Sequence, residues 1–213
     1  MQKMTTPLPR VYFITDRHQI PGKKSFFDVM EELLNAGLKL VQLREKDLTT
    51  RELFLLAQQL RHLTQSYNCR LIINDRIDIA LAVSADGVHL GQHSLPPRAA
   101  RDILGANALI GVSTHSHLEL QRAQDQGADF ATYGPVYFTP SKAEYGPPVG
   151  IHSLQEAISS VNIPVFALGG IKSENIREVL SSGCYGVAAI SALSNAFSPA
   201  DTYFQFSAAL EKT

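Results

Sequence analysis

Short apolar runs rich in β-branched residues alternate with longer amphipathic stretches along all 213 residues, and this alternation restricts the fold more than any other feature. The runs predict strands at Val11–Thr15, Leu40–Leu43, Leu71–Asn74, Gly87–Leu90, Leu109–Ser113, Phe130–Gly134, Val165–Leu168 and Gly186–Ile190. Continuous apolar strands are typical of a parallel sheet that helices cover on both faces.

Segments with apolar residues at helical spacing separate the runs. The predicted helices are Ser25–Ala36, Thr50–Ser66, Ile77–Val83, Arg98–Leu104, Leu118–Gln126, Ser153–Val161, Asn175–Ser182 and Asp201–Leu210. Eight strands, each followed by a helix, predict a (β/α)8 TIM barrel. A doubly wound open sheet is the alternative, because periodicity does not show closure. Since no linker-like segment divides the chain, residues 1–213 are predicted to form a single domain.

Charge and cysteine content exclude several functional classes. The net charge of −1 provides no basic field for nucleic acid or an anionic membrane. No apolar run reaches the roughly 18 residues that span a bilayer, and Met1–Arg10 has no apolar signal core. Cys69 and Cys184 lie far apart and form no CxxC pair. We therefore expect a cytoplasmic protein with small-molecule ligands, and a homo-oligomer remains possible.

Polar residues cluster directly after the apolar runs, at the end of the barrel where such folds hold their active sites. The clusters are Thr15-Asp16-Arg17, Gln42-Arg44-Lys46, Asn74-Asp75-Arg76, His89-Gln92, Ser113-His115, Thr139-Ser141-Lys142, Gly169-Gly170 and Ser191. A surface built only for solubility would scatter polar residues over the helices instead. The pattern therefore predicts a site at the C-terminal ends of the strands.

Arg44 and Lys46 follow the second strand with one residue between them, so in extended chain they share a face. Two cations on one face suit a diphosphate, because guanidinium grips oxygens bidentately and ammonium acts as a point charge. The alternative is a solvated ion pair with Glu45 or Asp47.

Asn74 and Asp75 end the third strand. A carboxylate beside an amide suits Mg²⁺, which uses one or two carboxylates together with water and substrate phosphate. The alternative is an Asx turn that caps the helix beginning near Arg76.

Three further residues with useful side chains follow later strands. His115 suits a general acid or base, Ser113 suits a hydrogen bond to a substrate ring, and Lys142 in the long loop 135–150 suits an anion. An ordinary surface residue is the alternative for each of His115 and Lys142. His89 lies within a strand, so we expect it to have a structural role.

Gly169 and Gly170 follow the seventh strand, and Ser191 follows the eighth. Glycines allow backbone N–H groups to approach a phosphate, and the last two loops form the common phosphate site of these barrels. A tight turn also needs glycine. The residues alone therefore suggest two anion sites, a pattern that suits the joining or rearrangement of phosphorylated small molecules.

Seven segments, in order along almost the whole chain, resemble the thiamin phosphate synthase/TenI superfamily. They are VYFITDR (11–17), VQLREKD (41–47), LIINDRIDIALAVSADGVHLGQ (71–92), GVSTHS (111–116), ADFATYGPVYFTPSK (128–142), PVFALGGI (164–171) and GVAAISAL (186–193). The resemblance implies a (β/α)8 barrel that handles a thiazole phosphate. In the synthase branch, hydroxymethylpyrimidine diphosphate loses diphosphate and the thiazole nitrogen captures the pyrimidine cation.

The resemblance also implies roles for individual residues. Pyrimidine diphosphate would contact Gln42, Arg44, Lys46, Asn74, Ser113 and Lys142. Thiazole phosphate would contact Thr139, Ser141, Gly170, Ile190 and Ser191, with Gly169 beside them. Asp75 would hold Mg²⁺.

One position departs from the synthase pattern. Ser94 stands where a second acidic Mg²⁺ ligand is usual, and a hydroxyl is a poorer ligand than a carboxylate. This departure resembles the TenI-type branch, in which a thiazole tautomerase would use His115 as its acid and base. The retained Arg44, Lys46 and Asp75 favour the synthase. A regulator that binds thiazole phosphate without catalysis is the third possibility.

Overall fold

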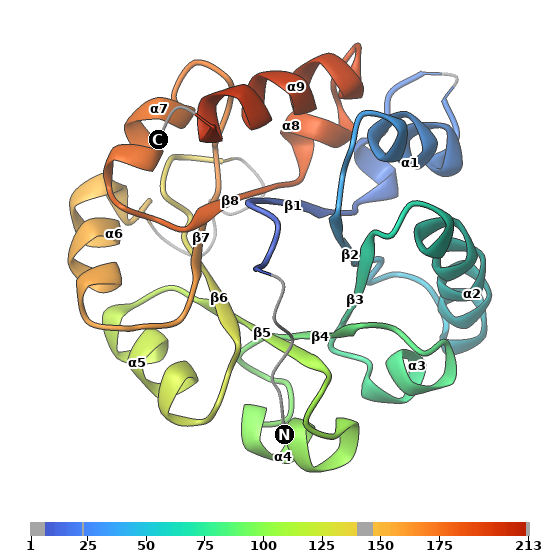
Figure 1. Ribbon diagram of the computed structural model, residues 1–213, viewed down its shortest axis with the longest axis horizontal. Coiled ribbons are helices and arrows are strands. Elements are labelled where there is room, and N and C mark those ends of the chain that lie inside the picture. The colour runs from blue at the N-terminus through green and yellow to red at the C-terminus, as the bar shows by residue number, and fades with distance from the viewer. Residues whose placement is uncertain (1–6, 23, 140–146, 212–213) are drawn as a thin grey trace.

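Eight parallel strands close into a barrel in sequence order (Figure 1). The computed structural model describes residues 7–22, 24–139 and 147–211. The strands are β1 (Val11–Ile14), β2 (Leu40–Leu43), β3 (Arg70–Asn74), β4 (Gly87–Leu90), β5 (Leu109–Thr114), β6 (Phe130–Tyr133), β7 (Val165–Leu168) and β8 (Gly186–Ala189). Parallel pairing of β1 with β8, in which Val11 lies opposite Val187, closes the ring. The predicted TIM barrel is confirmed, and the open-sheet alternative is wrong.

Helices surround the ring of strands (Figure 1). They are α1 (Phe26–Asn35), α2 (Thr50–Ser66), α3 (Ile77–Ala82), α4 (Pro97–Leu104), α5 (His117–Asp125), α6 (Gly150–Ser159), α7 (Ile176–Ser181), α8 (Ser191–Ser194) and α9 (Pro199–Leu210). Capping boxes begin two of them. Ser25 and Asp28 bond reciprocally at the start of α1, and Thr49 and Glu52 do so at α2. These local capping signals explain why the predicted bounds of both helices agree closely with the observed ones.

Two short helices were absent from the sequence prediction. They are a 3-10 turn, η1 (Arg17–Gln19), and the four-residue α8. Neither is long enough to show a helical period. Strand β8 ends at Ala189, so Ser191 begins α8 instead of following the strand in a loop. Helix α6 begins at Gly150, three residues before the predicted start at Ser153.

The core has two layers because successive strand residues face opposite sides of the sheet. Residues such as Val11 and Phe13 pack between the sheet and the helices. The barrel interior holds a separate cluster of Tyr12, Ile14, Leu40, Ile72, Phe130, Phe166 and Ala188. The Tyr12 and Phe130 rings meet edge to face, with centroids 5.5 Å apart. These rings pack together inside the barrel.

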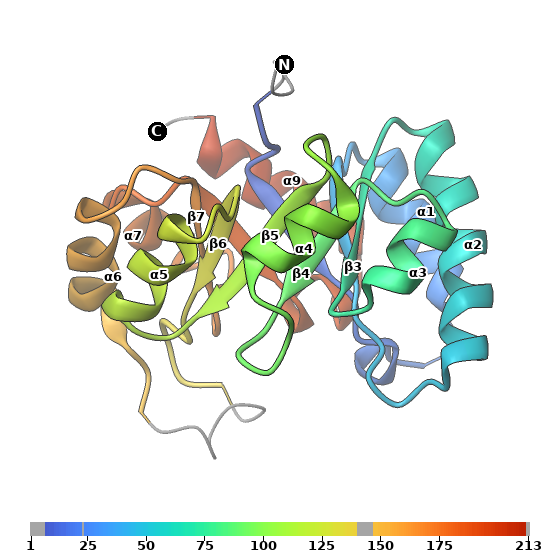
Figure 2. The ribbon, with the colours of Figure 1, turned by 90° about the horizontal axis from the view of Figure 1, so that it is seen from below.

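The two ends of the barrel differ (Figure 2). The described residues before β1 lie at one end, whereas the described residues that follow β6 extend from the other end, to which the C-terminal ends of the strands lead. The site residues predicted from the sequence come from this second end. None of the helices in the described ranges combines the length and apolar character that a bilayer crossing requires.

Candidate active site

A cavity lies at the C-terminal ends of β5 to β8, and several predicted site residues meet there. It is lined by Gln19, His115, Gly134, Pro135, Thr139, Leu168, Gly169, Gly170, Ile171, Ala188, Ala189, Ile190, Ser191 and Ala192. All of the predicted thiazole-phosphate residues that the structure describes are among them. Gln19, on η1, was missed from the sequence, although it lies only two residues beyond the polar cluster Thr15-Asp16-Arg17.

Gly169 and Gly170 are required by the geometry of this cavity. Both have a positive φ, +101° and +66°. A Cβ on Gly170 would lie 2.7 Å from the Cβ of Tyr137, and a Cβ on Gly169 would lie 2.6 Å from the Cα of Pro135. The glycines therefore allow the loop after β7 to lie directly against the segment after β6.

Backbone N–H groups at the cavity are available to an anion. Within the described ranges, no hydrogen bond uses the N–H of Gly170 or Ser191 as donor. The Gly170 carbonyl instead accepts a bond of 2.9 Å from the Asn175 side-chain amide, which fixes the loop. Available amides beside a glycine turn are the arrangement that binds phosphate.

Arg44 and Lys46 follow β2 at the same end of the barrel. Arg44 is half-buried and Lys46 is exposed. The expected alternative, an ion pair with Glu45 or Asp47, is not what forms, because both carboxylates pair with Arg17. Among the described residues, no carboxylate forms an ion pair with Arg44 or Lys46, so both cations are available to an anionic ligand.

A chain of buried polar side chains crosses the barrel interior. The Gln42 amide donates to the Tyr12 hydroxyl at 2.7 Å, and this hydroxyl lies 3.2 Å from His89 Nδ1. His89 Nε2 lies 3.0 Å from Ser113 Oγ. Since the Tyr12 oxygen accepts from Gln42, its proton points to Nδ1, and Nε2–H then donates to Ser113. The Ser113 hydroxyl proton is left for another acceptor.

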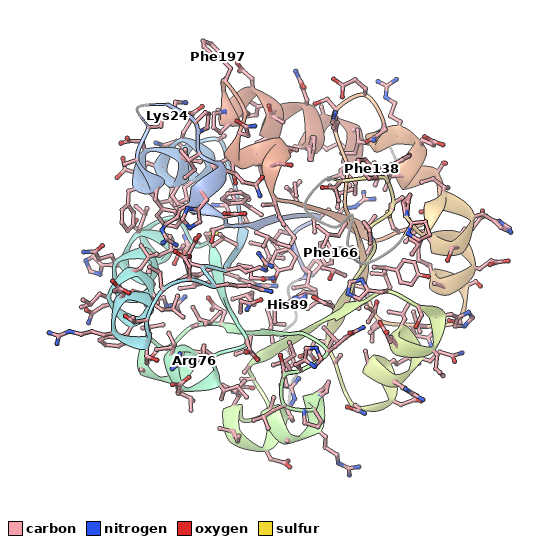
Figure 3. The ribbon with its side chains drawn as sticks, turned by 180° about the vertical axis from the view of Figure 1, so that it is seen from behind. Lys24, Arg76, His89, Phe138, Phe166 and Phe197 are labelled. Atoms are coloured by element: carbon pink, nitrogen blue, oxygen red, sulfur yellow. The ribbon has the colours of Figure 1, made fainter. Side chains whose placement is uncertain are left out.

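His89, the middle member of this series of polar contacts, is fully buried and lies near the centre of the barrel in Figure 3. Burial, together with the nearby positive charge of Arg44, lowers the pKa of His89 to about 3. The imidazole is therefore neutral at physiological pH. The sequence predicted a structural role for His89, and the structure adds that it joins predicted ligand-binding residues on β2 and β5.

Asp75 lies just after β3 and adopts a positive φ of +63°, which is uncommon for a residue other than glycine. The proposed capping alternative is wrong, because α3 begins without a side-chain cap. Arg76 pairs with Asp78, with Nη2 2.5 Å from Oδ2, and not with Asp75. Asn74 is paired in register with His89 of β4 and is half-buried.

Asp75 is the carboxylate proposed for a divalent cation, and no cage of metal ligands surrounds it within the described residues. The described residues contain no group of three His, Cys, Asp or Glu side chains that suits a metal ion. At the position of the usual second acidic ligand, the Ser94 hydroxyl accepts the Gly91 N–H at 2.8 Å and adds no negative charge. The exposed carboxylate of Asp75 still fits Mg²⁺, which retains water and shares substrate phosphate oxygens.

His115 lies at the rim of the glycine cavity. Its Nδ1 lies 2.5 Å from the Gly134 carbonyl oxygen, which only accepts hydrogen bonds. Nδ1 therefore carries the proton, and Nε2 is the basic nitrogen. Ser141 and Lys142 lie outside the described residues, so their predicted roles remain predictions.

The family model described as thiamine monophosphate synthase matches residues 11–193. A Geobacter sulfurreducens protein named "Putative thiamine-phosphate synthase" is 55% identical over 183 residues, which cover 86% of this chain and 85% of that protein. The thiamine-phosphate synthase of Clostridium novyi is 42% identical over 86% of this chain and 90% of its own.

Solved structures agree with this relationship. A thiamine phosphate pyrophosphorylase from Pyrococcus furiosus superposes with a TM-score of 0.85 and 36% identity, covering 95% of this chain and 96% of its own. A 3-hexulose-6-phosphate synthase, at 16% identity and a TM-score of 0.72, shares the fold alone. The chain belongs to the thiamine monophosphate synthase family.

Proposed function

We propose that this protein is a thiamin phosphate synthase, a transferase that joins hydroxymethylpyrimidine diphosphate to thiazole phosphate or its carboxylate. The observation that carries the proposal is a pair of cations, Arg44 and Lys46, on the same end of the barrel as the glycine cavity, with no carboxylate partner among the described residues. One end thus offers places for two anions, as two phosphorylated substrates require.

The proposed reaction breaks one bond and forms another. The methylene C–O bond of the pyrimidine diphosphate breaks, and the electron pair leaves with diphosphate. The lone pair of the thiazole nitrogen then forms a C–N bond to the methylene carbon. Negative charge develops on the leaving group, so the step needs fixed positive charge more than it needs a base.

Arg44 and Lys46 would hold the diphosphate and stabilise its developing charge, and Lys142 would add a further positive charge. Asp75 would hold Mg²⁺. When bound, Mg²⁺ neutralises phosphate oxygens and makes diphosphate a better leaving group. Because the described residues provide no group of three or more metal ligands, we expect the affinity for Mg²⁺ to be low in the absence of diphosphate.

The buried polar chain would orient the pyrimidine. In the tautomer inferred above, the Ser113 oxygen accepts from His89, so its hydroxyl would donate to a ring nitrogen of the pyrimidine. Asn74, at the end of β3, would contact the same substrate. Gln42 is 1% exposed, so it would act mainly by fixing Tyr12 and, through it, His89.

The cavity would bind thiazole phosphate. Amides of Gly169, Gly170 and Ser191 are proposed to hold the phosphate, with the Thr139 and Ser141 hydroxyls beside them. Ile190 would contact the ring.

A coupled assay for diphosphate tests the proposal. We expect release only when both substrates are present, and loss of that release with EDTA. Arg44→Ala is expected to lower kcat/KM by about 100-fold, the scale of a lost charged hydrogen bond. Release that persists in EDTA would contradict the proposal.

A thiazole tautomerase is the second candidate, and the position of His115 favours it. Its Nε2 is free of the Gly134 contact, and the residue lines the cavity proposed for the thiazole. That activity would be independent of metal and would be lost in His115→Ala. A regulator that only binds thiazole phosphate would bind this ligand and show neither synthase nor tautomerase activity.

We also make proposals about ligands, location and oligomeric state. Small molecules are the proposed ligands, the cytoplasm is the proposed location, and a homo-oligomer is compatible with the exposed Phe197 and Phe204 near and on α9. Gel filtration with light scattering tests the last of these.

A further inference from the structure

Glu45 occupies the position between the two proposed diphosphate-binding cations, yet it neutralises neither of them. Its side chain is 1% exposed. Both carboxylate oxygens lie 3.2 Å from the backbone N of Arg17, and Oε2 lies 3.1 Å from Arg17 Nη1. A buried carboxylate is costly unless it is paired and hydrogen-bonded, and here Arg17 does both.

Arg17 also pairs with the next carboxylate along the segment. Its guanidinium bonds Asp47 through both Nη atoms, and His18 Nε2 lies 3.1 Å from Asp47 Oδ2. The hydrogen bond from Arg17 holds the pKa of Asp47 well below its usual range. Arg17, on η1, therefore forms ion pairs with Glu45 and Asp47, the two acidic residues that flank Lys46.

A further contact with the segment after β1 fixes the backbone at Arg44. The N–H of Arg44 donates to Thr15 Oγ1 at 2.9 Å, and the Thr15 N–H donates to the Gln42 carbonyl at the same distance. Thr15 is buried. The loop after β1 thus holds residues 44–47 through a hydroxyl, a backbone N–H and a guanidinium.

The charge balance of the segment explains what this achieves. Residues 44–47 alternate cation and anion, so their formal charges cancel and by themselves they offer an anion little net charge. Arg17 pairs with both carboxylates, Glu45 and Asp47, which leaves Arg44 and Lys46 for an anionic ligand. Arg44 remains close enough to the barrel interior for its charge to act on His89.

We propose that Arg17 and Glu45 are positioning residues for diphosphate binding. Their ion pair fixes the segment after β2 and keeps Arg44 and Lys46 unpaired for the diphosphate oxygens. This inference rests on the proposed function, in which those two cations bind diphosphate.

Calorimetric titration of inorganic diphosphate with Mg²⁺ tests the pair directly and requires no turnover. Glu45→Gln keeps the shape of the side chain and removes its charge. We expect this variant to bind diphosphate about tenfold more weakly or worse, although the site gains net positive charge. Affinity for thiazole phosphate should not change.

Asp86→Asn is the matched control. Asp86 also pairs with an arginine and a backbone N–H, at 2.6 Å to Arg61 Nη1 and 2.8 Å to the N of Leu71, but at the opposite end of the barrel. It should lower Tm about as much as Glu45→Gln does, with diphosphate affinity unchanged. In the double variant Arg17→Gln/Glu45→Gln, the loss should be smaller than the sum of the two single losses.

Three results separate the possibilities. Wild-type affinity, or tighter binding, in Glu45→Gln would overturn the positioning role. An equal loss of diphosphate affinity in Asp86→Asn would reduce the effect to general destabilisation and also overturn it. If the wild type binds diphosphate and Glu45→Gln does not, but no thiamin phosphate forms, the positioning role stands and the proposed function fails.

Discussion

The buried imidazole of His89 makes a sharp prediction about stability and pH. The pKa of His89 is about 3 in the folded protein, whereas an unfolded histidine titrates near 6.5. Below pH 6.5 the unfolded chain therefore takes up a proton that the folded chain does not. Stability from this group is fully present above pH 6.5 and is lost as the pH falls from 6.5 towards 3.

The size of the loss follows from the same two values. Between pH 7.5 and pH 5.0, linkage at one site gives about 2 kcal/mol of lost stability. For a chain of 213 residues this corresponds to a fall in Tm of about 4–8 °C. His89→Gln removes the titrating group and keeps polar atoms beside Tyr12 and Ser113. Titratable groups that the wild type and His89→Gln share make the same pH-dependent contribution to stability, so these contributions cancel in the difference between the two proteins.

Urea unfolding at pH 7.5, 6.5, 5.5 and 5.0 provides the measurement. The wild type should lose about 2 kcal/mol more than His89→Gln across this range. His62→Gln, on the exposed surface of α2, is the control and should keep the wild-type slope. A stability difference between wild type and His89→Gln that is the same at every pH would refute the reasoning, because His89 would then titrate equally in both states.

Four further outcomes are expected from substitutions at the site. Asp75→Asn should reduce diphosphate release by about 100-fold, measured at saturating Mg²⁺, and wild-type release would contradict the metal assignment. Ser94→Asp should lower the Mg²⁺ concentration for half-maximal activity by about tenfold, and an unchanged value would show that this position does not contact the metal. Gly170→Ala should weaken thiazole phosphate binding at least about tenfold by calorimetry, because its Cβ would meet Tyr137 at 2.7 Å with φ at +66°. His115→Ala should alter synthase turnover by less than about fivefold, and near-total loss of synthase turnover would move the assignment towards acid–base chemistry.

Periodicity and composition were sufficient to locate the eight strands. Each strand is a short apolar run between a cap and a turn, and all eight were predicted within about one residue at each end. Closure was not visible in this pattern, because it depends on the pairing of β1 with β8, far apart in the chain. The resemblance to a known family, together with the repeated strand–helix pattern, favoured the closed form.

The composition of the site was predictable for a different reason. Parallel strands bring their C-terminal ends to one edge, so residues such as His115, Gly170 and Ser191 were expected to meet, and they line one cavity. The partners of charged residues were not predictable. Arg17 lies 28 residues before Glu45, and only the neighbouring positions of β1 and β2 bring the two together.

The buried polar chain shows the same limit. A histidine within an apolar strand predicts burial, but its contacts with Tyr12 and Ser113 depend on which residues face the barrel interior from β1 and β5. The short helix α8 was missed because four residues carry no period. Gln19 was missed because the turn that places it at the cavity has no strong sequence signal.

Two separate anion sites on one end of the barrel are the basis of the proposed function, and simultaneous binding tests them most directly. Thiazole phosphate is titrated calorimetrically into protein already saturated with Mg²⁺ and inorganic diphosphate. We predict binding of one thiazole phosphate per chain, with the same stoichiometry as in protein without diphosphate. Competition, in which saturating diphosphate abolishes the binding of thiazole phosphate, would show a single anion site and contradict the account.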